Sequence, residues 1–174
     1  MPKLIRNGRV VDDSAEILVL DETQAPEALT LPEEQVCVPL AVWQAHKGML
    51  AGRAGVGVWL DSHESVEDLA EDLESLSAVA LNFPKFTDGR AYSGAALLRS
   101  RYAFKGEVRA IGDVLRDQFF FMQRCGFDTL QPKAGKYSDS QLEEAVASLK
   151  DFSSPYQAAI DQPEPLFRRA QRIA

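Results

Sequence analysis

Four short apolar stretches recur through the middle of the chain, and each is followed by a segment with helical spacing. The apolar stretches begin near residues 56, 78, 108 and 127. Nearly continuous apolar runs of this length are typical of strands that are covered on both faces. The alternation of strand and helix predicts a parallel sheet with right-handed crossovers. Four repeats are too few for an eight-stranded barrel, so we expect an α/β sheet that is open or curved like half a barrel.

The segments after these strands predict helices over residues 66–76, 91–102, 114–125 and 140–149. In the first of them, apolar residues recur every three or four positions and carboxylates occupy the opposite face, as in an amphipathic helix. Asp113 is placed to cap the third helix. Ser140 followed by Glu143 predicts a capping box at the start of the fourth.

The N-terminal residues predict a β-hairpin. Asn7-Gly8 lies between two short apolar runs, and this pair favours a type I′ turn because both residues tolerate positive φ. A third short strand is expected over Ile17–Leu20, and a helix is expected from Pro39 to about Ala51.

The length and composition predict one domain. A chain of 174 residues with 45% hydrophobic residues can bury one proper core. We expect a single α/β domain over residues 1–152, with the hairpin and third strand at 3–20. Residues 153–174 contain several prolines and predict a partly ordered C-terminal tail.

Charge and cysteine content exclude several classes of function. The net charge of −7 argues against a nucleic-acid partner, because phosphate binding needs a positive field. No apolar run approaches the roughly 20 residues of a membrane span, and the first residues lack the apolar core of a signal peptide. Cys37 and Cys125 lie far apart without a CxxC motif, so no four-thiolate cluster and no metal site are expected. These features predict a cytoplasmic protein with reduced thiols.

The loop after the second of these strands carries five candidate ligand-binding residues: Asn82, Asp88, Gly89, Arg90 and Ser93. Ligands of α/β sheets bind outside the carboxyl ends of the strands, where this loop lies. Free N–H groups at a helix start beside a guanidinium suit a small oxyanion. The structural alternative is that Asp88 caps the helix, Gly89 serves the turn and Arg90 pairs with a carboxylate.

The loop after the third strand carries a second candidate group: Asp113, Arg116 and Asp117. Spacings of three and four place these side chains on one helix face, where Arg116 can pair with Asp113. In a functional interpretation, Asp113 or Asp117 is a catalytic acid or base and Arg116 clamps an anion. A structural ion-pair network explains the same residues equally well. No dinucleotide-binding or P-loop motif occurs, so no cofactor is predicted from a recognisable motif.

The helix expected over residues 114–125 is apolar around much of its circumference, with three consecutive phenylalanines, Phe119–Phe121. Such a helix is covered on two sides. The sheet supplies one cover, and either a neighbouring element or the second subunit of a homodimer supplies the other.

Two stretches resemble a known family: NFPKFTDGRAYS at residues 82–93 and RAIGDVLRDQFFFMQRCGFD at residues 109–128. They are similar to a bacterial family of uncharacterised proteins, a domain of unknown function that carries the label of an oxidoreductase of sulfite reduction. Its genes lie beside those of assimilatory sulfite reductase. The family tends to have glycine where this chain has Ala91. The resemblance implies a role in sulfur assimilation and brings no known mechanism.

The residues limit what that role can be. Six-electron reduction of sulfite requires a haem-type macrocycle and an iron–sulfur cluster, and two cysteines are too few to hold such a cluster. We therefore expect an accessory protein that binds sulfite reductase, helps to deliver electrons or handles a small sulfur oxyanion. Two alternatives remain: a cofactor-independent lyase or isomerase with an aspartate base, and an interaction module that docks on the reductase through Phe119–Phe121.

Overall fold

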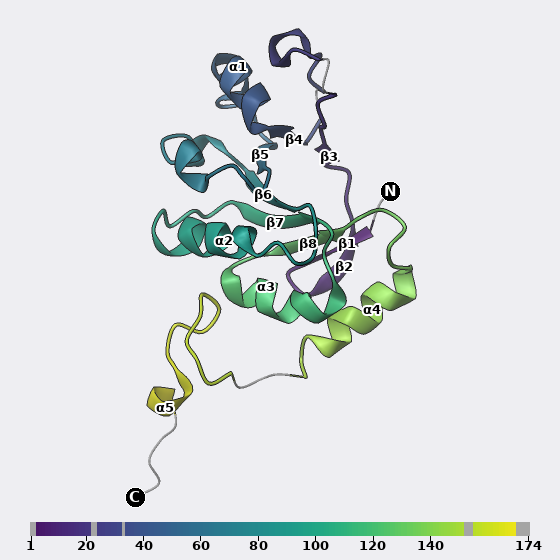
Figure 1. Cartoon of the computed structure of the whole chain (residues 1–174), viewed down its shortest axis with the longest axis vertical. Helices are drawn as coiled ribbons and strands as arrows, with labels where there is room; N and C mark the ends of the chain where they lie inside the picture. Colours follow the sequence, from purple (N-terminus) through teal and green to yellow (C-terminus); the bar gives the residue numbers. More distant parts are fainter. Residues whose placement is uncertain (1–2, 22–23, 33, 152–154, 170–174) are drawn as a thin grey trace, which may run out of the picture.

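A single eight-stranded sheet forms the centre of the molecule (Figure 1). The computed structural model describes residues 3–21, 24–32, 34–151 and 155–169. In spatial order the strands are β2-β1-β8-β7-β6-β5-β4-β3. Their bounds are β1 (Lys3–Arg6), β2 (Arg9–Asp12), β3 (Glu16–Ile17), β4 (Val36–Pro39), β5 (Val56–Leu60), β6 (Ala78–Phe83), β7 (Glu107–Gly112) and β8 (Thr129–Pro132).

The strands from β3 to β8 are parallel, and β1 pairs antiparallel with both β8 and β2. Each parallel neighbour is the next strand along the chain, so right-handed crossovers bring the helices to one side of the sheet. These helices are α1 (Leu40–Leu50), α2 (Arg90–Ser100), α3 (Phe119–Cys125) and α4 (Asp139–Ser148). The prediction of a mainly parallel α/β sheet, open or half-barrel-like, with an N-terminal hairpin is confirmed. Of the two forms, the observed sheet has the curled, half-barrel one.

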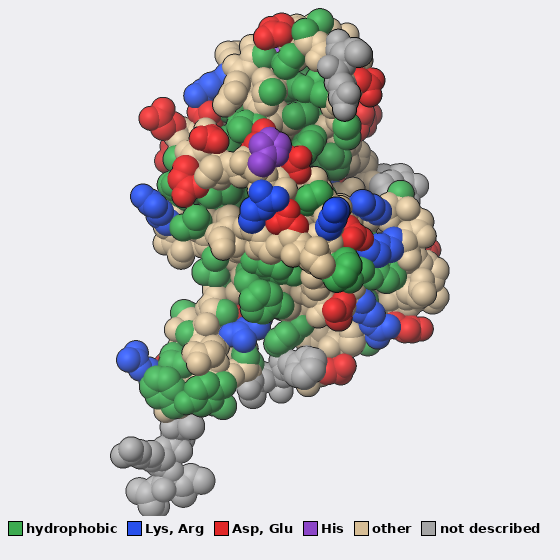
Figure 2. All heavy atoms as spheres, viewed as in Figure 1, with side chains coloured by type: hydrophobic (Ala, Val, Ile, Leu, Met, Phe, Trp, Pro, Cys, Tyr) green, Lys and Arg blue, Asp and Glu red, His purple; other side chains and the backbone are tan. Residues whose placement is uncertain are grey.

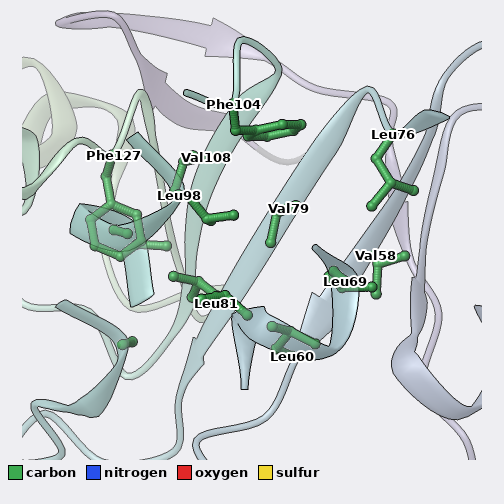
Figure 3. Packing of buried hydrophobic residues seen from close by; sticks show 14 of the residues in the cluster. Val58, Leu60, Leu69, Leu76, Val79, Leu81, Leu98, Phe104, Val108 and Phe127 are labelled. Atoms are coloured by element: carbon green, nitrogen blue, oxygen red, sulfur yellow. The ribbon is translucent and has the colours of Figure 1, made fainter. Parts of the chain in front are cut away.

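Alternate residues of the strands build two separate clusters. The larger one packs under the helices and includes Val58, Val79, Leu81 and Val108 (Figure 3). The smaller one covers the opposite, concave face and contains Cys37, Ala78, Ala80 and Ile111, with Ile17 and Trp59 packed against them. Small side chains allow this face to curve inward, because the inner side of a curved sheet is the more crowded one.

The connection between β2 and β3 requires the sheet to curl. These strands are the two edges, yet only residues 13–15 join them. Edges of a flat eight-stranded sheet would lie about 33 Å apart. The chain from Asp12 to Glu16 spans at most about 15 Å. The two edges must therefore approach each other, and residues 13–15 cross the concave side between them.

A buried ion pair attaches this connection to strand β7. Arg109 of β7 donates to Asp13 at 2.6 Å, and the two side chains are only 2% and 4% exposed. Arg6 also donates to Asp13, and Glu107 accepts from Arg109. Burial alone raises the pKa of Asp13, but the charges and hydrogen bonds of Arg109 and Arg6 outweigh this effect and hold the pKa below its ordinary value.

Two helices expected from the sequence differ in the structure: one is replaced by 3-10 helices, and the other begins later. The segment 66–76 forms two short 3-10 helices, η2 (Val66–Leu69) and η3 (Leu73–Ser75). Asp72 interrupts them because its buried carboxylate accepts from Trp43 and pairs with Lys47 of α1. The helix expected from residue 114 starts at Phe119, after the 3-10 turn η4 (Arg116–Gln118). The cap predicted at Asp113 was wrong, because this carboxylate binds the Phe86 N–H and Lys136 instead.

Three smaller expectations are corrected or extended. The capping box of α4 is formed by Ser138 and Gln141, two residues earlier than the predicted pair. Residues before the first helix form the additional strand β4, which ends at Pro39. The third strand is shorter than expected, and Leu18 and Leu20 pack against the larger cluster. The turn prediction is confirmed, with positive φ at both Asn7 and Gly8.

A fourth 3-10 turn of the described residues, η1 (Pro26–Ala28), lies before β4. The described part of the tail contains the short helix α5 (Leu166–Arg169). The tail contacts the end of α3, where the Ile160 N–H donates to the Arg124 carbonyl at 3.1 Å. Arg124 also pairs with Asp161 at 3.5 Å. These contacts attach the tail to the helical side of the domain.

We predict that Arg109→Met lowers the free energy of unfolding by about 3–5 kcal/mol, because it leaves the buried carboxylate of Asp13 without its main partner. Urea unfolding at neutral pH measures the change. Arg116→Met is the matched control: it breaks an exposed pair with Glu144 and should cost no more than about 1 kcal/mol.

The same comparison has a pH signature. The lowered pKa of Asp13 means that the pair stabilises the fold above the ordinary aspartate pKa and loses this effect as the pH falls through the lowered value. The difference between wild type and Arg109→Met should therefore narrow in acid. A difference that stays constant down to the unfolding pH would contradict the role assigned to the pair.

Candidate functional site

The carboxyl ends of β5, β6, β7 and β8 lie together at one end of the sheet, and two of the cavities at this end share Asn82. The smaller cavity, of about 170 Å³, lies between the ends of β5 and β6 and the helix α2. The larger one, of about 480 Å³, opens on the concave side. Asn82 lines both. Its amide donates to Asp61 at the end of β5 at 2.9 Å, which fixes its orientation between the two cavities.

Arg90 is held by its own loop. Its guanidinium donates to both oxygens of Asp88 and, at 2.9 Å, to the hydroxyl of Ser62. Asp88 also accepts the backbone N–H of Arg90, the first residue of α2, from the position before the N-cap Gly89. These hydrogen bonds from Arg90 hold the pKa of Asp88 well below its ordinary range. The structural interpretation of Asp88 and Arg90 thus describes the observed contacts.

The cavity beside Arg90 has mixed charge. Ser62, Ser93 and Asn82 line it with hydroxyl and amide groups. Asp61, Glu64 and Glu67 line it as well, and carboxylates repel an oxyanion. Gly89 precedes α2 with a negative φ, and a side chain there would contact only the Tyr92 ring at 3.8 Å. This cavity is less suited to an anion than the sequence suggested. Figure 2 shows the same mixture, with Lys and Arg side chains interspersed with carboxylates across the middle of the face.

Asp113 joins three loops at this edge. Its carboxylate accepts the Phe86 N–H at 2.9 Å and pairs with Lys136, which follows β8. The hydrogen bond from Lys136, together with that from Phe86, lowers the pKa of Asp113. A general base works best when its pKa lies near the operating pH. The contacts of Asp113 are those of a fixed counter-ion that ties the loops together.

Arg116 and Asp117 lie elsewhere. Arg116 pairs with Glu144 of α4 at 3.3 Å and does not contact Asp113. Arg116 and Asp117 line a separate groove of about 580 Å³, together with Phe120 and Leu149. The structure therefore divides the candidate residues into two groups. The first group, at the carboxyl ends of the strands, contains Asn82, Asp88, Gly89, Arg90, Ser93 and Asp113. The second group, Arg116 and Asp117, belongs to η4 and lines the groove beside the end of α4.

The larger cavity combines an apolar wall with a polar rim. Trp59, Ile111 and Pro132 are among its apolar residues, and Asn82, Gln131 and Lys133 supply polar groups. Lys133 is exposed, and among the described residues its ammonium group makes no hydrogen bond or ion pair, although its charge contributes to the lowered pKa of Asp113. Ligand sites in proteins are commonly built this way, from an apolar lining with a few polar or charged groups.

Sequence reasoning missed Trp59, Gln131 and Lys133. Trp59 and Gln131 sit on strands at positions that alternate with the helix-facing core, and Lys133 directly follows β8. The alternation along each strand is a usable signal, because it separates the concave face from the helix-covered one. This signal could have identified Trp59 and Gln131 if it had been known that helices cover only one face of the sheet.

Thiols and metal ligands add no second site. Cys37 lies on the concave face, where burial raises its pKa to about 11. Burial also raises the pKa of Cys125. Among the described residues, no group of three or more His, Cys, Asp or Glu side chains is placed to hold a metal ion. No helix in the described ranges is long and apolar enough to cross a membrane.

Comparison with known proteins adds one family. The family described as "Bacterial protein of unknown function (DUF934)" matches residues 57–167, which is more than half of the 174-residue chain. The match begins in β5 and ends in α5, so it includes Trp59, Asn82, Gln131 and Lys133. No curated protein and no solved structure matches the chain.

We predict that Gly112→Ala destabilises the fold by about 3–5 kcal/mol and displaces Asn82. Gly112 has a φ of +97°, and a methyl group there would lie 2.5 Å from both the Asn82 side-chain oxygen and the Phe83 carbonyl. Gly135→Ala is the matched control, with a φ of +76° and nothing within 4 Å, and should cost only about 1–2 kcal/mol. Chemical unfolding measures both, and equal losses would show that the contact with Asn82 is unimportant.

The role of Asp113 can be measured by NMR titration of its carboxyl carbon. We expect a pKa below the ordinary value of 3.8, rising when Lys136→Met removes the largest cause of the shift. The Phe86 N–H remains in this variant, so only part of the shift should be lost. A pKa near neutrality in the wild type would instead support a catalytic base.

Proposed function

We propose that this chain, which belongs to the DUF934 family of bacterial proteins of unknown function, is an accessory protein of sulfite reduction that binds a small oxyanion at Lys133. The resemblance of residues 82–93 and 109–128 to the family labelled for sulfite reduction supports the biological process. The unpaired ammonium group at the rim of the larger cavity supports the binding of an anion. This second observation carries the proposal.

The surroundings of Lys133 favour an anion in two ways. The described residues that line the larger cavity include no carboxylate, so none of them repels a bound anion. The carboxylate of Asp113, on which the charge of Lys133 also acts, is paired with Lys136. An oxyanion at Lys133 thus meets less competition than one at Arg90, whose guanidinium is occupied by Asp88.

An accessory role fits the residues better than the reduction itself. Multi-electron reduction depends on cofactors, and the two cysteines lie on different parts of the fold. Cys37 is buried on the concave face, whereas Cys125 ends α3. The lyase or isomerase alternative requires an aspartate base, and the lowered pKa of Asp113 makes that residue a weak one.

Docking on the reductase is a second candidate function, and two exposed aromatic residues favour it. Phe121 of α3 is 54% exposed and Phe86 of the neighbouring loop is 49% exposed. Phe121 packs on Tyr92 with ring centroids 5.1 Å apart, so its position is fixed. Phe119 is fully buried and cannot contact a partner. Aromatic anchors of this kind are enriched at protein interfaces.

We predict that sulfite, or another oxyanion among sulfate, phosphate and adenylyl sulfate, raises the melting temperature of the wild type. A ligand at 100 times its Kd stabilises by about 2.7 kcal/mol, which is roughly 5–11 °C for a chain of this length. Lys133→Met should abolish the rise, because it removes the charge and keeps most of the side-chain volume. Differential scanning fluorimetry at low ionic strength measures the melting temperature with and without each anion.

Two variants serve as controls. Lys105→Met removes an exposed lysine before β7, at the amino ends of the parallel strands. It should leave the rise in melting temperature unchanged. Arg90→Met should have a small effect. If only Arg90→Met abolishes the rise in melting temperature, the anion binds in the smaller cavity and not at Lys133. A screen without any rise would contradict anion binding and leave docking through Phe121 as the better hypothesis.

A further inference from the structure

We infer that the larger cavity binds a planar heteroaromatic ring that carries an anionic group, with the ring beside Trp59 and the anion at Lys133. The inference rests on the proposed function, because the anionic group takes the place of the free oxyanion. It adds the class of molecule to which that anion belongs.

The size and wall of the cavity require more than a simple oxyanion. A volume of about 480 Å³ lies within the roughly 300–1,000 Å³ that small organic ligands occupy. A tetra-atomic or penta-atomic anion at Lys133 would leave the apolar wall of Ile17, Trp59 and Ile111 exposed to water. A ring that covers this wall gains the free energy of apolar burial.

Trp59 has a fixed orientation in which a flat ligand can stack on its indole ring. Its indole N–H donates to the Leu18 carbonyl at 2.6 Å, which fixes the plane of the ring. Trp59 remains partly exposed, in contrast to Trp43, which is fully buried in the core. An aromatic side chain with a fixed orientation loses little conformational entropy when a flat ligand packs on it.

The polar groups beside this wall have defined hydrogen-bonding roles. Arg109 donates to the Gln131 side chain at 3.0 Å, and arginine can only donate, so the amide oxygen of Gln131 is used. The NH₂ group of Gln131 is left as a donor. Asp61 can only accept from Asn82, so the NH₂ group of Asn82 is used and its oxygen, next to Gly112, is left as an acceptor.

One donor and one acceptor at the wall of an apolar cavity complement a ring edge that offers both kinds of group. Nucleobases and related heteroaromatic rings have such an edge, with an N–H beside a carbonyl oxygen or ring nitrogen. Purely aliphatic or hydrocarbon ligands would leave these polar groups unpaired, which costs free energy. With Lys133 at the rim, the best-matched ligand is a heteroaromatic ring joined to a phosphate, sulfate or carboxylate.

The test compares charged and neutral partners of the same ring: AMP with adenosine, and FMN with riboflavin. Isothermal titration calorimetry gives each Kd for the wild type, Lys133→Met and Lys105→Met. We expect at least one charged ligand to bind at least tenfold more tightly than its neutral partner. Lys133→Met should remove that difference and leave the neutral ligand unchanged, whereas Lys105→Met should change neither.

Tryptophan emission locates the ring. Trp43 is shielded in the core, so quenching by AMP should come from Trp59 and should disappear in Trp59→Phe. Lys133 is exposed, so Lys133→Met tests the site without disturbing the core.

The outcomes separate this inference from the proposed function. Oxyanions that bind at Lys133 while no ring ligand binds more tightly than phosphate would overturn the inference and leave the proposed function standing. The proposed oxyanion site would be overturned if ring ligands quench Trp59 equally with and without the charged group and their Kd is unchanged in Lys133→Met. Absence of all binding would overturn both.

Discussion

The short connection between β2 and β3 is the constraint on which the architecture depends. Three residues cannot join the edges of a flat eight-stranded sheet, so the sheet has to curl. The curl creates the concave face, and Asp13 from the connection reaches Arg109 there. Two buried charges cost desolvation, and this cost is offset only because the pair is direct and further hydrogen-bonded. The ion pair and the curvature therefore depend on each other.

The same arginine links the curvature to the larger cavity. One guanidinium binds Asp13 of the connection, Glu107 at the start of β7 and Gln131 of β8. Its contact with Gln131 determines which end of that amide faces the cavity. The amino half of the concave face is consequently filled by charged groups that satisfy one another, whereas the carboxyl half keeps polar groups available to a ligand.

Much of the fold could be predicted, because apolar runs and helical spacing are local properties of the sequence. The parallel strands, the hairpin and most helices follow from them. The choice between an open sheet and one curved like half a barrel could not be made, because the curvature depends on contacts between residues as distant as Asp13 and Arg109. The helix expected at 66–76 failed for a related reason: Asp72 is drawn into a buried contact with Trp43, which no local pattern shows. Of the candidate site, the edge of the sheet and Asn82 were predictable, whereas Lys133 required knowledge of which cations lack partners.

The pairing of the first strand with the last has a consequence for the order of folding. Ile5 of β1 pairs with Leu130 of β8, so the hairpin is synthesised before its partner strand and can join the sheet only when β8 is present. Until then the apolar side chains of Leu4 and Ile5, which are fully buried in the native state, have no core to enter. Contacts between such distant residues close slowly because the intervening chain must first be ordered. The hairpin of β1 and β2 needs only neighbouring residues, whereas its attachment to β8 has to bridge more of the chain than any other strand pairing of the sheet.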